Sequence, residues 1–184
     1  MKNIFFHIDV NSAFLSWEAV YRIVHKGGKQ DLREIPSAVG GDMSVRHGII
    51  LAKSLPVKQY GIKTGEAILE AQRKCPNLVP VPPNYSLYEK CSAAFMGILR
   101  EYSDIVEQYS IDESFVDMTG SCHLFGEPVT VAEQIKDHIR DHIRDKLGFT
   151  VNVVVSNNKL CGGYELWNGI NRNGNFYTFR CSSC

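Results

Sequence analysis

The sequence lacks a long apolar run, an excess of either charge, and acidic residues in one central segment. No stretch of its 184 residues approaches the ~20 apolar residues that a membrane-spanning helix needs. Lys and Arg number 20, and Asp and Glu also number 20, so the formal net charge is zero. Proteins that hold duplex DNA unaided usually carry a clear basic excess, and this chain as a whole does not.

The length and the even mix of apolar and charged residues fit one globular domain or two small lobes. The apolar N-terminus is interrupted by His7 and Asp9, unlike a secretory signal peptide, so we expect a cytoplasmic protein with no membrane partner. His7 itself is expected to be a packed side chain and not a metal ligand. Cys75, Cys91 and Cys122 lie among apolar residues, which predicts reduced, packed thiols.

Two adjacent carboxylates stand between strand-like runs in the segment Tyr109–Asp117. Neighbouring side chains on a straight strand point to opposite faces, so Asp112 and Glu113 can serve one site only if the chain bends there, as at a hairpin tip. Like charges at a tip are costly unless a cation neutralises them. A solvated turn is the alternative interpretation of the pair taken alone.

A third acid strengthens the case for a metal site. Residues 4–9 predict a buried strand ending in Asp9, followed by a helix over 12–25 that is capped by Asn11 or Ser12. Three acids on two neighbouring strands can hold two divalent ions for phosphoryl transfer. Because the ligands are all oxygen atoms, Mg²⁺ or Mn²⁺ is favoured over zinc.

Five segments, in a fixed order, carry a resemblance to a known family. They are Phe6–Phe14, Gly48–Ser54, Tyr60–Glu66, Tyr109–Ser114 and Val155–Lys159. As a set they resemble the Y-family (translesion) DNA polymerases, in particular the UmuC/DinB-like bacterial group, over roughly residues 1–160. The resemblance implies an α+β fold with a polymerase palm, which is a ferredoxin-like sheet with packed helices, and a small inserted fingers lobe.

The pattern of apolar residues agrees with an α+β fold. An apolar residue recurs every four positions from Ile135 to Leu147, which predicts an amphipathic helix that packs on a sheet. Residues 149–155 predict a strand. Helices thus alternate with strands around the acidic hairpin, which favours a sheet layered with helices. With the resemblance, we expect the palm over 1–20 and 84–160 and the fingers over 21–83.

The resemblance stops after Lys159 and Leu160. Residues 161–184 contain no Ala or Val and show no helix or strand period, so we expect a divergent, disordered tail. The thumb and little finger are then absent, and the chain is expected to be a truncated polymerase with weak or no activity. The tail ends in Cys181 and Cys184, where the lack of a second pair argues against a zinc or redox site.

The resemblance also implies roles for the acids. Asp9, Asp112 and Glu113, with the backbone of Val10, would hold two Mg²⁺ ions, with Mn²⁺ as a substitute. The primer 3′-hydroxyl would attack the α-phosphate of a dNTP during lesion bypass in DNA repair. Phe14 matches the steric gate, an aromatic ring that excludes a ribose 2′-hydroxyl. A core side chain is the alternative interpretation of Phe14.

A basic segment is the expected nucleotide-binding site. No acid lies between Asp42 and Glu66, where four basic residues fall, which predicts a triphosphate cradle or, alternatively, a solvated basic face. The four are Arg46, Lys53, Lys58 and Lys63. By resemblance, Lys58 and Lys159 contact the triphosphate. The chain has Leu55 and Lys58 where the family has Tyr and Arg. The phenolic hydroxyl of the Tyr and the bidentate guanidinium of the Arg are therefore lost.

Primer-template DNA and dNTP are the expected partners, with the replication sliding clamp as a further partner of the full-length parent. A non-catalytic remnant that acts as a binding module is the second hypothesis. Gly40–Ser44 resembles the start of the GGDEF signature of nucleotide cyclases, but Met43 stands where an acid is needed. His138 and His142 could share a metal, although the repeat around them predicts a solvated stripe.

Overall fold

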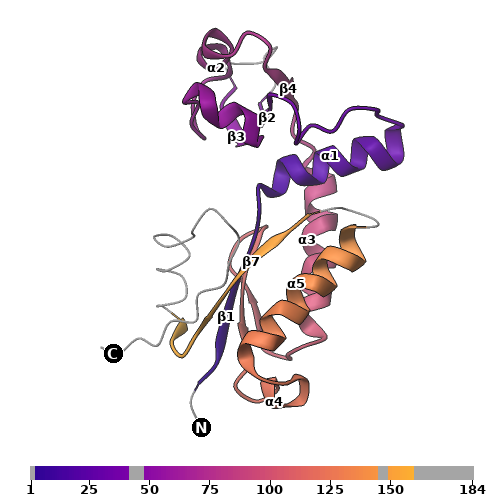
Figure 1. Ribbon diagram of the computed structural model, residues 1–184, viewed down its shortest axis with the longest axis vertical. Helices are drawn as coiled ribbons and strands as arrows, with labels where there is room; N and C mark the ends of the chain where they lie inside the picture. The colour runs from indigo at the N-terminus through magenta and orange to yellow at the C-terminus, as the bar shows by residue number, and fades with distance from the viewer. Residues whose placement is uncertain (1–2, 42–47, 145–148, 160–184) are drawn as a thin grey trace. The chain divides into compact units, whose positions relative to one another are not determined.

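The computed structural model describes residues 3–41, 48–144 and 149–159, without the side chains of 141–144. These residues form two compact units (Figure 1): a first unit of 3–11, 90–144 and 149–159, and a second unit of 12–41 and 48–89. The elements in chain order are β1 (Phe5–Val10), α1 (Ala13–Lys26), β2 (Ser37–Gly40), β3 (Ile50–Lys53), η1 (Leu55–Tyr60), α2 (Ile68–Lys74), β4 (Val79–Val81), α3 (Tyr85–Arg100), β5 (Val106–Gln108), β6 (Glu113–Asp117), α4 (Cys122–Phe125), α5 (Pro128–Arg144) and β7 (Val151–Ser156).

A four-stranded antiparallel sheet forms the centre of the first unit, in the order β5-β6-β1-β7. Side chains alternate between its faces, so Phe6 and Ile8 of β1 are fully buried on one face, which α3 and α5 cover (Figure 1). His7 and Asp9 lie on the opposite face. The strand predicted over residues 4–9 is confirmed as β1, and its side chains divide between the face that bears Phe6 and Ile8 and the face that bears Asp9.

The amphipathic helix predicted from the apolar repeat is α5. Ile135 and Ile139 are fully buried, and α5 packs on β7. The helix begins at Pro128, earlier than the apolar repeat indicates. Proline is tolerated in the first turn of a helix, so Pro128 is compatible with this start. Leu147 and the side chains of His142 and Ile143 lie outside the described residues.

The second unit is built on a three-stranded sheet in the order β3-β2-β4, in which β2 pairs antiparallel with β3 and parallel with β4. Its apolar core includes Ile50, Val57 and Ile68. Glycine is required at position 40, since a Cβ atom there would lie 2.6 Å from the carbonyl oxygen of Ile49 and 2.7 Å from Cδ1 of Ile68.

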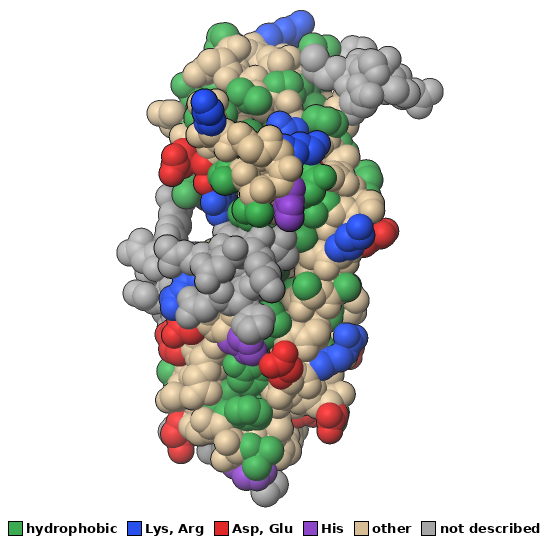
Figure 2. Space-filling model, turned by 90° about the vertical axis from the view of Figure 1, so that its right-hand side faces the viewer, with side chains coloured by type: hydrophobic (Ala, Val, Ile, Leu, Met, Phe, Trp, Pro, Cys, Tyr) green, Lys and Arg blue, Asp and Glu red, His purple; other side chains and the backbone are tan. Residues whose placement is uncertain are grey.

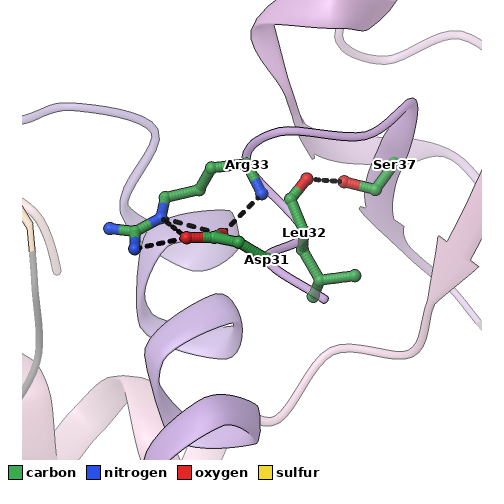
Figure 3. A network of polar contacts seen from close by, with 4 residues as sticks. All are labelled: Asp31, Leu32, Arg33 and Ser37. Carbon is green, nitrogen blue, oxygen red and sulfur yellow. Dashed lines mark hydrogen bonds and ion pairs between the residues drawn. The ribbon is translucent and has the colours of Figure 1, made fainter. Parts of the chain in front are cut away.

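Polar contacts order the connection between α1 and β2 in the second unit (Figure 3). The Asp31 carboxylate accepts hydrogen bonds from the backbone N–H of Arg33 at 2.8 Å and from its guanidinium at 2.6–3.0 Å. These bonds hold the pKa of Asp31 below its ordinary value. The Ser37 hydroxyl donates to the carbonyl oxygen of Leu32 at 2.5 Å. The turn therefore fixes where β2 begins.

The predicted N-cap of α1 is confirmed in its position but not in its hydrogen bond. Ser12 is the N-cap residue of α1, but its φ of 47° places it in the left-handed region, and it makes no capping hydrogen bond within the described chain. A capping side chain normally sits on extended backbone, which explains the failure. Asn11 instead donates to Thr150 Oγ1 at 3.0 Å. The short helix α4 was not predicted.

Several expectations fall outside the described residues. They concern the tail over 161–184 with Cys181 and Cys184, the basic side chain of Arg46, and the Asp42–Ser44 part of the GGDEF-like segment. None of the helices in the described ranges has both the length and the apolar character that crossing a bilayer requires.

Replacing Ile139 by Ala should destabilise the first unit by about 2–5 kcal/mol, because the change leaves a cavity between α5 and the sheet. Urea unfolding followed by circular dichroism measures the free energy of unfolding. Glu133→Ala is the matched control on the same helix, since Glu133 is exposed and makes only a 3.9 Å ion pair with Lys136. Equal losses in the two variants would contradict the packing of α5.

Candidate active site

The acidic hairpin predicted from the sequence is present between β5 and β6. The backbone N–H groups of Tyr109 and Ser110 both donate to the carbonyl oxygen of Glu113, at 3.0 and 3.2 Å. The Ser110 hydroxyl oxygen accepts from the N–H of Asp112 at 3.3 Å and of Glu113 at 3.1 Å. These bonds bend the chain at Asp112 and start β6 at Glu113, so the two carboxylates need not point to opposite faces.

The strand register brings Asp9 to this hairpin. Asp9 on β1 is the direct antiparallel partner of Glu113 on β6. The next residue, Val10, donates its backbone N–H to the carbonyl oxygen of Asp112 at 3.0 Å. Asp9, Asp112 and Glu113, which we call the acidic triad, therefore meet at one end of the β1–β6 pair.

Burial is the largest influence on the pKa values of Asp9 and Glu113 in the acidic triad, and mutual repulsion adds to it. Burial, followed by the charges of Asp112 and Glu113, raises the pKa of Asp9 from 3.8 to about 7. Burial and the Asp112 charge also raise the pKa of Glu113. Near neutral pH the chain therefore resists carrying three negative charges at this point. A bound cation would relieve this repulsion.

The donor set of the acidic triad fits Mg²⁺ or Mn²⁺, since every side-chain donor is a carboxylate oxygen. Within the described ranges, however, no group of three or more His, Cys, Asp or Glu side chains is placed so as to hold a metal ion. Two of the carboxylates have partners of their own. Asp112 Oδ1 accepts from the Ser110 hydroxyl at 2.6 Å, and Glu113 Oε1 lies 3.9 Å from His7 Nε2.

Aromatic and charged side chains surround the acidic triad on the same sheet face. His7 is 3% exposed and stacks on Phe115, with ring centroids 4.2 Å apart, so the prediction that His7 is packed is confirmed. Lys159 Nζ lies 5.1 Å from the Phe115 centroid and 2.5 Å from Glu107 Oε2. The first unit thus places Lys159 near the acidic hairpin, where it pairs with Glu107.

The sequence interpretation missed Asn152, which is the cross-strand partner of Asp9 on β7. Asn152 Nδ2 donates to Asn11 Oδ1 at 2.7 Å, and Asn11 in turn donates to Thr150. These bonds tie the end of β1 to β7. A signal was available, because Asn152 is the one polar residue in the apolar strand run 151–155.

Phe14 lies in the second unit, on the first turn of α1. Its ring stacks on Tyr88 at a centroid distance of 4.7 Å and is tilted against Trp17 at 6.1 Å. Tyr88 and Trp17 are fully buried, whereas Phe14 is half-buried. The structure therefore places a partly exposed ring on a rigid aromatic base, and neither supporting residue was identified from the sequence.

Three lysines of the basic segment lie near one another in the second unit. Burial, followed by the charge of Lys58, lowers the pKa of Lys53, and Lys63 contributes in the same direction. Lys53 Nζ donates to the carbonyl oxygen of Ile62. Leu55, on η1 with Lys58, is 70% exposed. On the face shown in Figure 2, basic and acidic side chains are interspersed.

Comparison with known proteins connects this geometry to a family. The model of the impB/mucB/samB family matches residues 8–162. The chain is 47% identical over 161 residues to DNA polymerase IV of Clostridium acetobutylicum, covering 87% of this chain and 39% of that protein. It is 41% identical over 160 residues to DNA polymerase IV of Acetivibrio thermocellus, covering 87% of this chain and 37% of that protein.

Solved structures agree with these matches. The crystal structure of DinB from Sulfolobus solfataricus superposes with a TM-score of 0.79 at 24% identity, covering 97% of this chain and 48% of that one. A structure described as the insertion ternary complex of Dbh DNA polymerase gives a TM-score of 0.75 at 25% identity. The match covers 97% of this chain and 49% of that one. The expected α+β palm-and-fingers fold is confirmed.

The chain spans about two fifths of the length of these curated relatives and about half of the solved structures. The family match covers most of the chain and includes all three acids of the triad. The resemblance inferred from the ordered motifs is therefore confirmed: this chain belongs to the impB/mucB/samB family, the Y-family of translesion DNA polymerases.

Proposed function

We propose that this chain is the palm and fingers portion of a translesion DNA polymerase, which adds dNTPs to a primer 3′-hydroxyl opposite a template. The palm would comprise residues 1–20 and 84–160, and the fingers residues 21–83. The observation that carries the proposal is the direct pairing of Asp9 with Glu113 beside Asp112, on the sheet face opposite α3 and α5. Primer-template DNA and dNTP would be the partners.

The acidic triad would hold two Mg²⁺ ions, with Mn²⁺ as a substitute and the Val10 backbone carbonyl as a further ligand. When bound, these ions supply activation of the attacking hydroxyl and stabilisation of the leaving pyrophosphate. The protein contributes a rigid geometry: Asp9 is fixed in β1 between Glu113 and Asn152. The raised pKa of Asp9 supports the assignment, because perturbed pKa values of this kind cluster at functional sites.

Residues outside the acidic triad would bind the nucleotide. Lys58 and Lys159 would neutralise the triphosphate, Lys159 by exchanging Glu107 for phosphate oxygens. Phe14 would act as the steric gate, held by Tyr88 and Trp17. Lys58 supplies a point charge where the family carries arginine, and Leu55 supplies no hydroxyl, so we expect weak triphosphate affinity.

A second function class, a non-catalytic binding module, has one observation in its favour. In the described part of the chain, Asp112 and Glu113 are turned toward Ser110 and His7 and form no three-ligand cluster. Mg²⁺-dependent nucleotide turnover that Glu113→Gln abolishes would exclude this alternative. Turnover that persists in Glu113→Gln, or no turnover together with no metal binding, would favour it.

Asp112→Asn should weaken Mn²⁺ binding at least about tenfold, because it removes one of the three carboxylates. Mn²⁺ titration followed by electron paramagnetic resonance measures the affinity directly. Asp104→Asn is the matched control, since Asp104 is an exposed acid in the same unit. Equal affinities in the two variants would place the metal site elsewhere.

Asp9→Asn should stabilise the metal-free chain at high pH. Asp9 titrates at 3.8 when unfolded and at about 7 when folded, so its proton-linked stabilisation is complete below pH ~4 and is lost as the pH rises to ~7. Relative to Asp9→Asn, the melting temperature of the unsubstituted chain should therefore fall between pH 5 and pH 8, and Mg²⁺ should restore part of it. A pH-independent difference would refute the coupling within the triad.

Phe14→Ala should reduce the preference for dATP over ATP by about tenfold, because removing the ring opens space for the 2′-hydroxyl. Equilibrium binding of both nucleotides in the presence of Mn²⁺ gives the ratio without requiring turnover. Tyr21→Ala, an aromatic substitution on the same helix, controls for general effects on α1. An unchanged ratio in folded Phe14→Ala would show that Phe14 is only a packing residue.

A further inference from the structure

The Ser110 hydroxyl group makes three hydrogen bonds at the acidic hairpin. Its hydroxyl oxygen accepts from the backbone N–H groups of Asp112 and Glu113, at 3.3 and 3.1 Å. Its hydroxyl proton goes to Asp112 Oδ1, at 2.6 Å. A serine hydroxyl has one proton to donate and two lone pairs to accept with, so all its capacity is used.

Full use of this hydroxyl fixes the side chain of Asp112. Because both lone pairs of Ser110 Oγ face backbone N–H groups, the proton is left for Asp112 Oδ1. The backbone of Asp112 is held separately, by the bond from Val10 N–H to its carbonyl oxygen. The main chain of Asp112 is thus tied to β1, while its carboxylate is tied back to its own turn.

The Ser110 bond also lessens the repulsion within the triad. A hydroxyl donor on Oδ1 withdraws negative charge from the carboxylate that faces Asp9 and Glu113. The bond can break without undoing the hairpin, since the N–H groups of Tyr109 and Ser110 bond to the Glu113 carbonyl independently. Asp112 can therefore leave Ser110 while the tip of the hairpin keeps its backbone geometry.

We propose that Ser110 is a positioning residue that competes with divalent cations for Oδ1 of the Asp112 carboxylate, to which its hydroxyl donates. This inference rests on the proposed metal site. The observation behind it is the hydrogen bond of 2.6 Å that already engages Asp112 Oδ1. Metal binding would exchange the Ser110 hydrogen bond for a metal–oxygen bond at Asp112.

The test is Mn²⁺ titration of four chains by electron paramagnetic resonance: the unsubstituted chain, Ser110→Ala, Ser110→Thr and Asp112→Asn. Ser110→Ala removes the competing donor and should tighten Mn²⁺ binding about three- to tenfold, the range expected for the loss of one typical intramolecular hydrogen bond. Ser110→Thr keeps the hydroxyl and should bind like the unsubstituted chain. Ser86→Ala, at an exposed serine, controls for the substitution itself.

Unchanged or weaker Mn²⁺ binding by folded Ser110→Ala would overturn the proposal while leaving the metal site intact. If Ser110→Ala fails to fold, Ser110→Cys decides in the same way, because a thiol is a weaker donor than a hydroxyl. Equal Mn²⁺ affinities of the unsubstituted chain and Asp112→Asn would instead refute the metal site, and the role of Ser110 with it. The titration therefore distinguishes the two failures.

Discussion

The pairing register of β1 with β6 is the constraint on which the site depends. It sets Asp9 opposite Glu113 and His7 opposite Phe115. A slip of one residue would move Asp9 to the face that α3 and α5 cover, where an ionised carboxylate is strongly unfavourable. The packing of Phe6 and Ile8, both fully buried, opposes this slip, since it would remove both side chains from that face. Core packing therefore determines where the charges lie.

The register stabilises the fold while concentrating charge that destabilises it. Burial and two neighbouring carboxylates raise the pKa of Asp9 to about 7. Full ionisation of the three acids is therefore unfavourable in the metal-free chain. The hydrogen bond from Ser110 to Asp112 lessens that repulsion. A bound cation would offset this repulsion between carboxylates. Its binding would therefore stabilise the folded chain.

Tertiary contacts also set the position of Phe14 and bring three lysines together in the second unit. Phe14 stands on Tyr88 and Trp17, two fully buried rings, so its position is set by aromatic contacts and not by the helix alone. Lys53, Lys58 and Lys63 lie close enough for their charges to lower the pKa of Lys53. Three basic side chains are therefore grouped locally, although the whole chain carries no net charge.

The sequence by itself determined the family, the α+β class and the positions of most helices and strands, because alternation and amphipathic spacing are local properties. It also indicated that Asp9, Asp112 and Glu113 belong together, since the ordered motifs resemble one family. Only the tertiary structure decided the pairings that join residues far apart in sequence: Asp9 with Asn152, and Phe14 with Tyr88. It also decided one local contact, the hydrogen bond from Ser110 to the Asp112 carboxylate. The same holds for Ser12, whose left-handed backbone defeats the capping bond that its residue type favours. Such contacts depend on register and packing, which no local pattern specifies.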